Sequence, residues 1–299
     1  MQSVIACGII CGKERNKNMT NATKISKAKN KKYTPNMDLL DSYSDITEHV
    51  PAPMVALFEF DSKKLVYCGT AHDNDISVKT INKCFEDFDI DCVVTEYDKN
   101  VTLTIPEDMT ALQNELEYAA LCGMRKGIDV VLADTGDKDW LKDMVNISRE
   151  NAKKMQLFFM LDDAHKYKRH FGENFSIERA LKNTVYKYWD EGLPTPMTKE
   201  EFQEYFMEQF GFEITDDNIS DIYEQHPEWY APDRNGSLIN KIWADINTYS
   251  RDPYMVKCIF EAVNSYDCVL ATFGAGHFDD HRRVLEHAFG KPTFIDIKA

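Results

Sequence analysis

Four short apolar segments, set between stretches of amphipathic helix, constrain the fold of this chain more than any other feature. Residues 77–88, for example, place Val78, Ile81 and Phe85 on one helical face. Alternation of strand and helix implies parallel pairing with right-handed crossovers. We therefore predict the fold class α/β, or α+β, with a βα-type sheet core. The four segments are residues 65–68, 92–95, 129–133 and 268–273.

Three further elements extend this sheet and its cover. Residues 54–60 and 65–68 are separated by a short polar turn, and this spacing predicts a hairpin. Residues 106–125 predict a long helix that Gly127 follows. Residues 293–297 predict a last strand.

The strand pattern stops after Asp134 and returns only at residue 268. Residues 137–249 show helical spacing instead, including a capping box at Thr198 and Glu201. We therefore predict one domain over 54–297, interrupted by an all-helical insertion at about 137–249. Residues 1–53 are predicted to be a basic, disordered leader and linker, and residues 1–32 are predicted to be dispensable for folding.

Charge is distributed unevenly along the chain. Residues 1–32 carry a net charge of +7, which leaves −22 for the rest of a chain whose total is −15. Phosphate backbones are bound by a surplus of Lys and Arg, so the acidic body argues against nucleic acid as a partner. A peptide or a small molecule is the expected substrate class. The oligomeric state is left open.

The sequence favours a cytoplasmic location. No apolar run reaches the roughly 18 residues that a membrane-spanning helix needs. Cys68, Cys84 and four further cysteines lie in apolar segments without CxxC spacing, which indicates free thiols. The alternative is an extracytoplasmic lipoprotein, because Val4-Ile5-Ala6-Cys7 is similar to the lipobox of a truncated leader.

Four polar residues stand at or just beyond the ends of apolar strands: His72, Glu96, Asp134 and His277. Side chains at the carboxyl edge of a parallel sheet converge, and nearby glycines permit close approach. Two imidazoles and a carboxylate form a common ligand set for a catalytic divalent metal, here His72, Glu96 and His277. The same groups could instead act as acid and base without a metal.

Neighbouring residues have simpler interpretations. Asp73 and Asp75 are read as the cap and first turn of the helix at 77–88, and Asp252 as the N-cap of a helix with Pro253 at its first position. Arg251 is either a surface residue or a cation directed at the site. His277 and His281 could share a metal on one helix, but residues 280–288 are read as a helix with an exposed face.

Four motifs in order resemble a known family. They are GTAH at 69–72, Glu96 after the next strand, Arg251-Asp252 before a late helix, and GAGH at 274–277. This set is similar to the TraB/PrgY/GumN and Tiki group, within the erythromycin-esterase/ChaN-like superfamily, over residues 54–297. The resemblance implies two βα halves facing one cleft, a helical insertion, and His72, Glu96, Arg251 and His277 as the functional residues.

The resemblance also frames three functional hypotheses. Tiki members are divalent-metal-dependent peptidases, which implies a metal-dependent hydrolase with Mn, Co or Zn. Macrolide esterases of the superfamily use the equivalent His and Glu, which implies a metal-independent ester or amide hydrolase. The third hypothesis is a non-catalytic regulatory or binding protein of the TraB pheromone-shutdown type.

Overall fold

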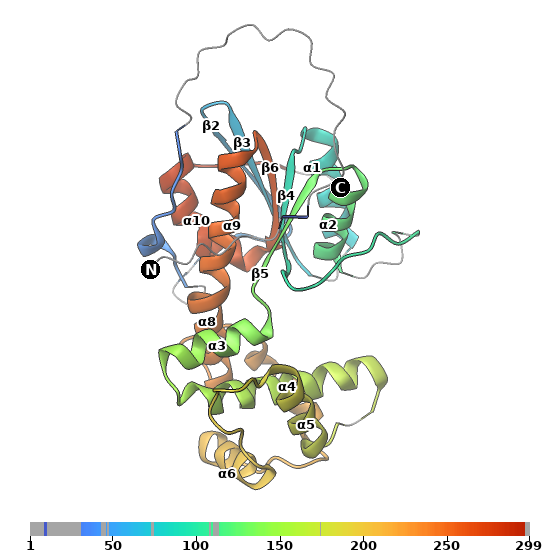
Figure 1. Cartoon of the computed structure of the whole chain (residues 1–299), viewed down its shortest axis with the longest axis vertical. Coiled ribbons are helices and arrows are strands. Elements are labelled where there is room, and N and C mark those ends of the chain that lie inside the picture. The colour runs from blue at the N-terminus through green and yellow to red at the C-terminus, as the bar shows by residue number, and fades with distance from the viewer. Residues whose placement is uncertain are drawn as a thin grey trace, which may run out of the picture. The chain divides into compact units, whose positions relative to one another are not determined.

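The computed structural model describes residues 9–10, 31–42, 46, 48–72, 75–107, 109, 114–173 and 175–296. The chain divides into two compact units, drawn in Figure 1. Unit 1 comprises Met1–Asp41, Glu48–Asp134 and Asp252–Ala299, and unit 2 comprises Ser42–Thr47 and Thr135–Arg251.

Unit 1 is built on one mixed sheet with the strand order β1-β5-β4-β6-β3-β2-β7. The central strands β3, β6, β4 and β5 run parallel, whereas β1, β2 and β7 pair antiparallel with their neighbours. The prediction that the four apolar segments share one sheet is confirmed. The strands are β1 (Ile9–Ile10), β2 (Met54–Phe60), β3 (Lys63–Thr70), β4 (Cys92–Asp98), β5 (Asp129–Asp134), β6 (Cys268–Gly274) and β7 (Thr293–Phe294).

Helices cover both faces of this sheet (Figure 1). One face packs against α9 and α10 around Tyr67, Phe273 and Phe278, and the other packs against α1 and α2 around Val66, Val93 and Leu121. The central strands are therefore apolar on both sides, as parallel strands are. The helices of unit 1 are η1 (Met37–Leu39), α1 (Asp75–Asp87), α2 (Glu115–Arg125), α9 (Asp252–Ser265) and α10 (Ala275–Phe289).

The helix predicted from residue 106 begins only at Glu115. The side chain of Asn114 accepts hydrogen bonds from the amides of Leu116 and Glu117 at 2.9 and 3.1 Å, which fixes the helix start there. This later start has a functional consequence, because Glu115 becomes the first residue of α2.

Tyr33, which follows the basic leader, packs within unit 1. Tyr33 is 5% exposed, and its ring contacts Phe60 and Phe289 at centroid distances of 5.1 and 5.3 Å. Its amide donates to the side chain of Asn264 at 2.8 Å. Tyr33 is thus part of the core of unit 1.

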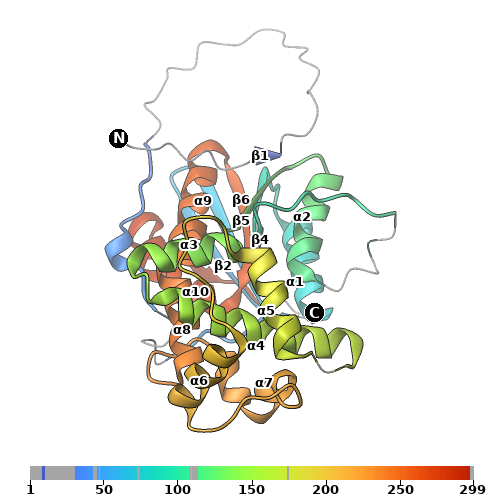
Figure 2. The same ribbon diagram turned by 60° about the horizontal axis from the view of Figure 1, so that its bottom comes forward.

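Unit 2 consists of helices in the part of the chain that is described, and Figure 2 labels its α-helices. The predicted capping box is present, because Thr198 and Glu201 exchange hydrogen bonds at the start of α6. The apolar run at residues 157–161 lies inside α4. The elements are α3 (Asp137–Ile147), α4 (Asn151–Phe171), α5 (Ile177–Tyr188), α6 (Lys199–Phe210), η4 (Ile219–Asp221), α7 (Ile222–Gln225), η5 (Pro227–Tyr230), α8 (Leu238–Ile246) and the π-helical turn η6 (Asn247–Arg251).

No helix within the described residues is both long enough and apolar enough to cross a membrane.

Candidate active and metal site

His72 lies directly beyond the end of β3, in a strained backbone conformation. Its φ is +47°. Non-glycine residues rarely adopt a positive φ, and those that do are concentrated at functional sites. The Ser77 hydroxyl of α1 accepts the amide of Ala71 at 3.0 Å and so holds this turn. The imidazole remains 56% exposed and is therefore open to a ligand from solvent.

A buried carboxylate orients this imidazole. Glu115, with a side chain only 3% exposed, lies 3.0 Å from His72 Nδ1 through its Oε1. The hydrogen bond from Glu115 is the largest influence on the pKa of His72, which it raises above its ordinary value. With Nδ1 engaged by Glu115, the second ring nitrogen of His72 is the one that can exchange a proton with a substrate.

Glu96 occupies the carboxyl end of β4, where it meets the end of β6. Its Oε2 accepts the amide of Gly274 at 2.7 Å, and its Oε1 lies 3.4 Å from His277 Nε2. A Cβ added at Gly274 would come within 2.5 Å of His72 Nε2 and 3.4 Å of Glu96 Oε2. Gly274 is thus the point around which His72, Glu96 and His277 gather, and only glycine fits there without displacing the His72 ring.

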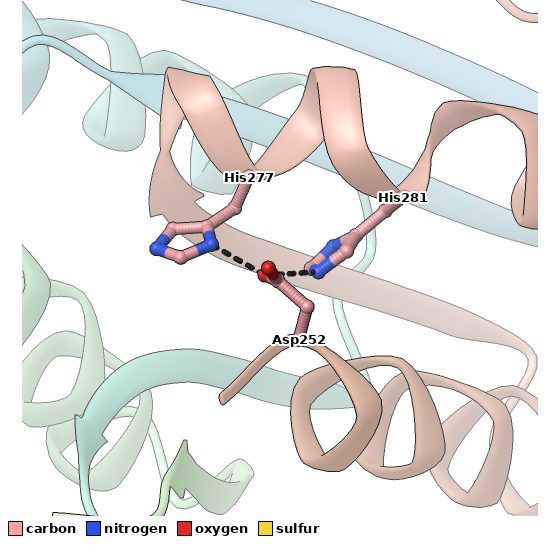
Figure 3. A group of neighbouring side chains, drawn as sticks. All are labelled: Asp252, His277 and His281. Atoms are coloured by element: carbon pink, nitrogen blue, oxygen red, sulfur yellow. Dashed lines mark hydrogen bonds and ion pairs between the residues drawn. The ribbon is translucent and has the colours of Figure 1, made fainter. Parts of the chain in front are cut away.

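His277 continues this arrangement into the interior of unit 1. Its Nδ1 lies 2.6 Å from Asp252 Oδ1, and the same oxygen lies 3.0 Å from His281 Nε2 (Figure 3). His281 Nδ1 in turn lies 3.2 Å from the hydroxyl of Tyr67. The two histidines are one helical turn apart on α10, and Asp252 is the first residue of α9.

The pKa values of these side chains are set by their burial and by the negative charges of Glu96 and Asp252. Burial alone would lower the pKa of His277, but the charges of Glu96 and Asp252 raise it to about 10. Burial would raise the pKa of Asp252, but the two imidazoles hold it well below its ordinary value. Burial lowers the pKa of His281, which favours its neutral form. His277 is therefore an imidazolium between two carboxylates at neutral pH.

Asp280 adds a further buried carboxyl beside this group. Burial and the negative charge of Asp252 raise its pKa to about 9. As carboxylate oxygens, Asp252 Oδ2 and Asp280 Oδ1 are both buried and receive no hydrogen bond within the described residues, whereas a proton on Asp280 would let the two carboxyl groups hydrogen-bond to each other. Unpartnered buried oxygens of this kind are costly, and a cation or a proton would satisfy them.

Asp252, His277 and His281 could hold a metal ion. Each offers one ligand atom, and the three atoms lie within 4.8 Å of one another. One carboxylate oxygen and two imidazole nitrogens are donors that suit Zn²⁺ and related divalent metals. His277 is the residue that this group shares with the predicted ligand set, whereas His72 and Glu96 stand on the solvent side of it.

The structure brings together three of the predicted residues, His72, Glu96 and His277, all in unit 1. Arg251 is the last residue of unit 2, where its guanidinium lies over the ring of Trp140 at 5.2 Å and donates to Asn247 at 3.2 Å. Asp134 ends β5 and is buried.

The structure places four residues at or beside the site that the sequence does not assign to it: Glu115, Asp252, Asp280 and His281. The sequence predicts Asp252 as a helix cap, but Asp252 is the first residue of α9, and its carboxylate bonds to His277 and His281. The exposed face expected for residues 280–288 does not include Asp280 and His281, which are buried. The four-residue spacing of His277 and His281 is the sequence pattern that indicates their shared site. No pattern in the sequence indicates a role for Glu115. Asp73 lies outside the described residues.

Comparison with protein-family models, with curated proteins and with solved structures gives no match to this chain.

Proposed function

We propose that this chain is a divalent-metal-dependent hydrolase of amide or ester bonds, with peptides as the first substrate class to test. The observation that carries the proposal is the continuity between the buried Asp252–His277–His281 group and the solvent-exposed His72. The metals to test are Mn, Co and Zn. The four motifs that resemble the TraB and Tiki group support the same reading.

The donor set fits a divalent metal, with one adjustment. Two ligands bound to a tetrahedral metal at its usual bond lengths lie about 3.3 Å apart. The separations of 2.6 and 3.0 Å in this group are those of hydrogen bonds, so metal binding needs a small widening and the loss of a proton from His277. The unpartnered Oδ2 of Asp252 offers a further donor.

A bound divalent metal lowers the pKa of a water molecule and polarises a carbonyl group. His72 supplies the accessible proton acceptor, and Glu115 fixes which ring nitrogen faces the substrate. After water attacks the carbonyl carbon, the protonated His72 can pass its proton to the departing amine or alcohol. Glu96 Oε1, at 3.4 Å from His277 Nε2, orients the neutral imidazole that would bind the metal, and Glu96 Oε2 accepts the Gly274 amide.

A second candidate is a hydrolase that works without a metal. It is favoured by the two carboxylates on either side of His277, which already satisfy both ring nitrogens. In this second candidate, His72 performs the acid–base chemistry and Glu115 orients its ring. Glu96, His277 and Asp252 form a row of charged side chains that keeps its charges and does not exchange protons with the substrate.

Metal content and turnover of the purified protein test the two candidates together. The first predicts a bound or restorable divalent metal, turnover on a panel of peptides and esters, and loss of turnover with a chelator. His281→Ala should lose metal and turnover, whereas His287→Ala, an exposed change on the same helix, should keep both.

The possible results separate the candidates. Turnover that survives complete metal removal, and is lost in His72→Ala, favours the metal-independent hydrolase. A well-folded protein that turns over nothing in the panel, with or without added metal, contradicts both.

A further inference from the structure

A pocket in unit 2 combines cationic and aromatic side chains. It has a volume of about 440 Å³, and Arg149, Lys153 and Lys154 line it together with the rings of Trp189 and Tyr205. Glu150 is the single acidic residue among the described residues of its lining. The pocket thus has a local surplus of positive charge in a chain whose net charge is −15.

These cations differ from most other lysines of unit 2 in having no carboxylate partner. Within the described residues, no ion pair joins Arg149, Lys153 or Lys154 to an acidic side chain, although Asp245 lies near enough to Lys154 for their charges to interact. The lysines that do form ion pairs in this unit are Lys138, Lys142, Lys166, Lys168, Lys187 and Lys199. Cations without partners around a hollow favour an anionic ligand.

Hydrogen bonds hold Gln156 and Trp189, two residues of the pocket lining, in place. Gln156, only 1% exposed, binds the backbone of Met197 through both carboxamide atoms at 2.7 and 3.1 Å. The Trp189 indole donates to the Pro194 carbonyl at 2.8 Å. A pocket with fixed aromatic walls binds a flat ring at little entropic cost.

A second hollow continues the cationic surface. It shares Lys154 with the first pocket and is lined by Arg234 and Lys241, with Asp245 as the carboxylate. Together, the two hollows can hold a ligand with an aromatic ring and several negative charges. The ring would lie near Trp189 and Tyr205, and the charges would lie near the cations.

The backbone of α4 does not contribute donors here. The amides of Asn151, Ala152 and Lys153 at the start of the helix already bond to carbonyl oxygens of the preceding turn. Recognition of an anion must therefore come from the side chains, and this makes it testable by single substitutions.

We propose that this pocket binds a nucleoside phosphate. The base lies against Trp189 and Tyr205, and the phosphates lie among Arg149, Lys153 and Lys154. Inorganic phosphate alone would leave the aromatic walls unused, and an uncharged aromatic compound would leave the three cations unpaired. This site belongs to unit 2 and does not depend on the hydrolase proposed for unit 1.

Titration calorimetry of the full chain with ATP, AMP, adenosine and tripolyphosphate tests the proposal. ATP should bind more tightly than AMP, and AMP more tightly than adenosine. Lys153→Glu should weaken ATP binding at least tenfold. Lys182→Glu, an equal change of charge on the exposed side of α5, should leave it within twofold. Tyr205→Ala should weaken ATP binding and leave tripolyphosphate binding unchanged.

Two results would overturn the proposal once circular dichroism has shown that the variants are folded. One is the absence of ATP binding at millimolar concentration. The other is tripolyphosphate binding as tight as that of ATP, with equal losses in Lys153→Glu and Lys182→Glu, which describes a non-specific polyanion surface.

Discussion

His277 Nδ1 lies 2.6 Å from Asp252 Oδ1, and both residues are buried in the interior of unit 1. Such a pair has lost most of its hydration, so its stability depends on the partners being present together. His277 also pairs with Glu96, and Asp252 also pairs with His281. The removal of one partner therefore affects charged groups on β4, α9 and α10.

Asp252→Asn should therefore destabilise the fold by about 3 kcal/mol, because it leaves the His277 imidazolium with only Glu96 to neutralise it. Denaturant unfolding of the variant and the wild type measures this cost. Asp267→Asn is the matched control, since Asp267 pairs with Lys63 at 3.7 Å but is 82% exposed. Its cost should stay below about 1 kcal/mol. Equal costs for the two variants would contradict the assignment of a buried charge chain.

In the protein freed of metal, the free energy of unfolding should depend on pH through His277. Its folded pKa of about 10 lies above the ordinary value near 6.5, so the folded state binds the proton more tightly. The resulting stabilisation is complete below about pH 6.5 and is lost as the pH rises through about 10. The difference in stability between the wild type and His277→Gln should shrink from pH 6 to pH 10. A constant difference would show that His277 is neutral in the folded protein.

Gly274→Ala should impair activity more than stability. The φ of −54° at Gly274 is open to alanine, but the new Cβ would displace the half-exposed His72 ring. Gly127→Ala is the opposite case, because its φ is +69° and the space around it is open. It should cost about 1 kcal/mol of stability and leave turnover unchanged. Thermal unfolding and a turnover assay, applied to both variants, distinguish the two effects. Full activity in Gly274→Ala would place the reacting centre away from His72.

Two parts of the chain before β2 contact unit 1 to different extents: Ile9–Ile10 pairs with β5 at the sheet edge, and Tyr33 is buried in the core. Deletion of residues 1–30 removes β1, but this edge strand pairs with β5 over only two residues, so the free energy of unfolding should change by less than about 1 kcal/mol. Tyr33→Ala should cost about 3 kcal/mol, since it removes a ring packed against Phe60 and Phe289. Denaturant unfolding of both proteins measures the contrast. A larger loss from the deletion than from Tyr33→Ala would show that β1 stabilises the fold more than the Tyr33 ring does.

The rise of activity on the acidic side of the pH profile should follow the deprotonation of the His72 imidazole. The Glu115 hydrogen bond raises the pKa of His72, so activity that needs the neutral imidazole should rise with pH through a value above 6.5. Glu115→Gln should move this rise to lower pH. A rise that does not move would exclude His72 as the titrating base.

The core strands could be predicted from sequence because their apolar runs are dictated by burial on both faces. His72, Glu96 and His277 could be predicted for a related reason, since each follows a strand of one parallel sheet and the strand ends meet. The glycines beside them, Gly69 and Gly274, were the signs of close approach.

The partners of these residues could not be predicted, because they come from helices. Asp252 has the sequence of an N-cap, and only the packing of α9 against α10 turns its carboxylate toward His277 and His281. Glu115 reaches His72 because α2 begins at residue 115, and that start depends on the cap formed by Asn114. The sequence places Tyr33 in a linker. Its burial could not be predicted, because it depends on contacts with Phe60 and Phe289, which are distant in sequence.

The position of β6 in the sheet has a consequence for how the protein is made. β6 lies between β3 and β4, yet it follows β4 by about 170 residues along the chain. At ribosomal rates of about 5–20 residues per second, β3 and β4 wait roughly 10–30 seconds for the strand that joins them. During that time the nascent chain presents two apolar strand edges, so its yield in a cell depends on chaperones that shield those edges during translation.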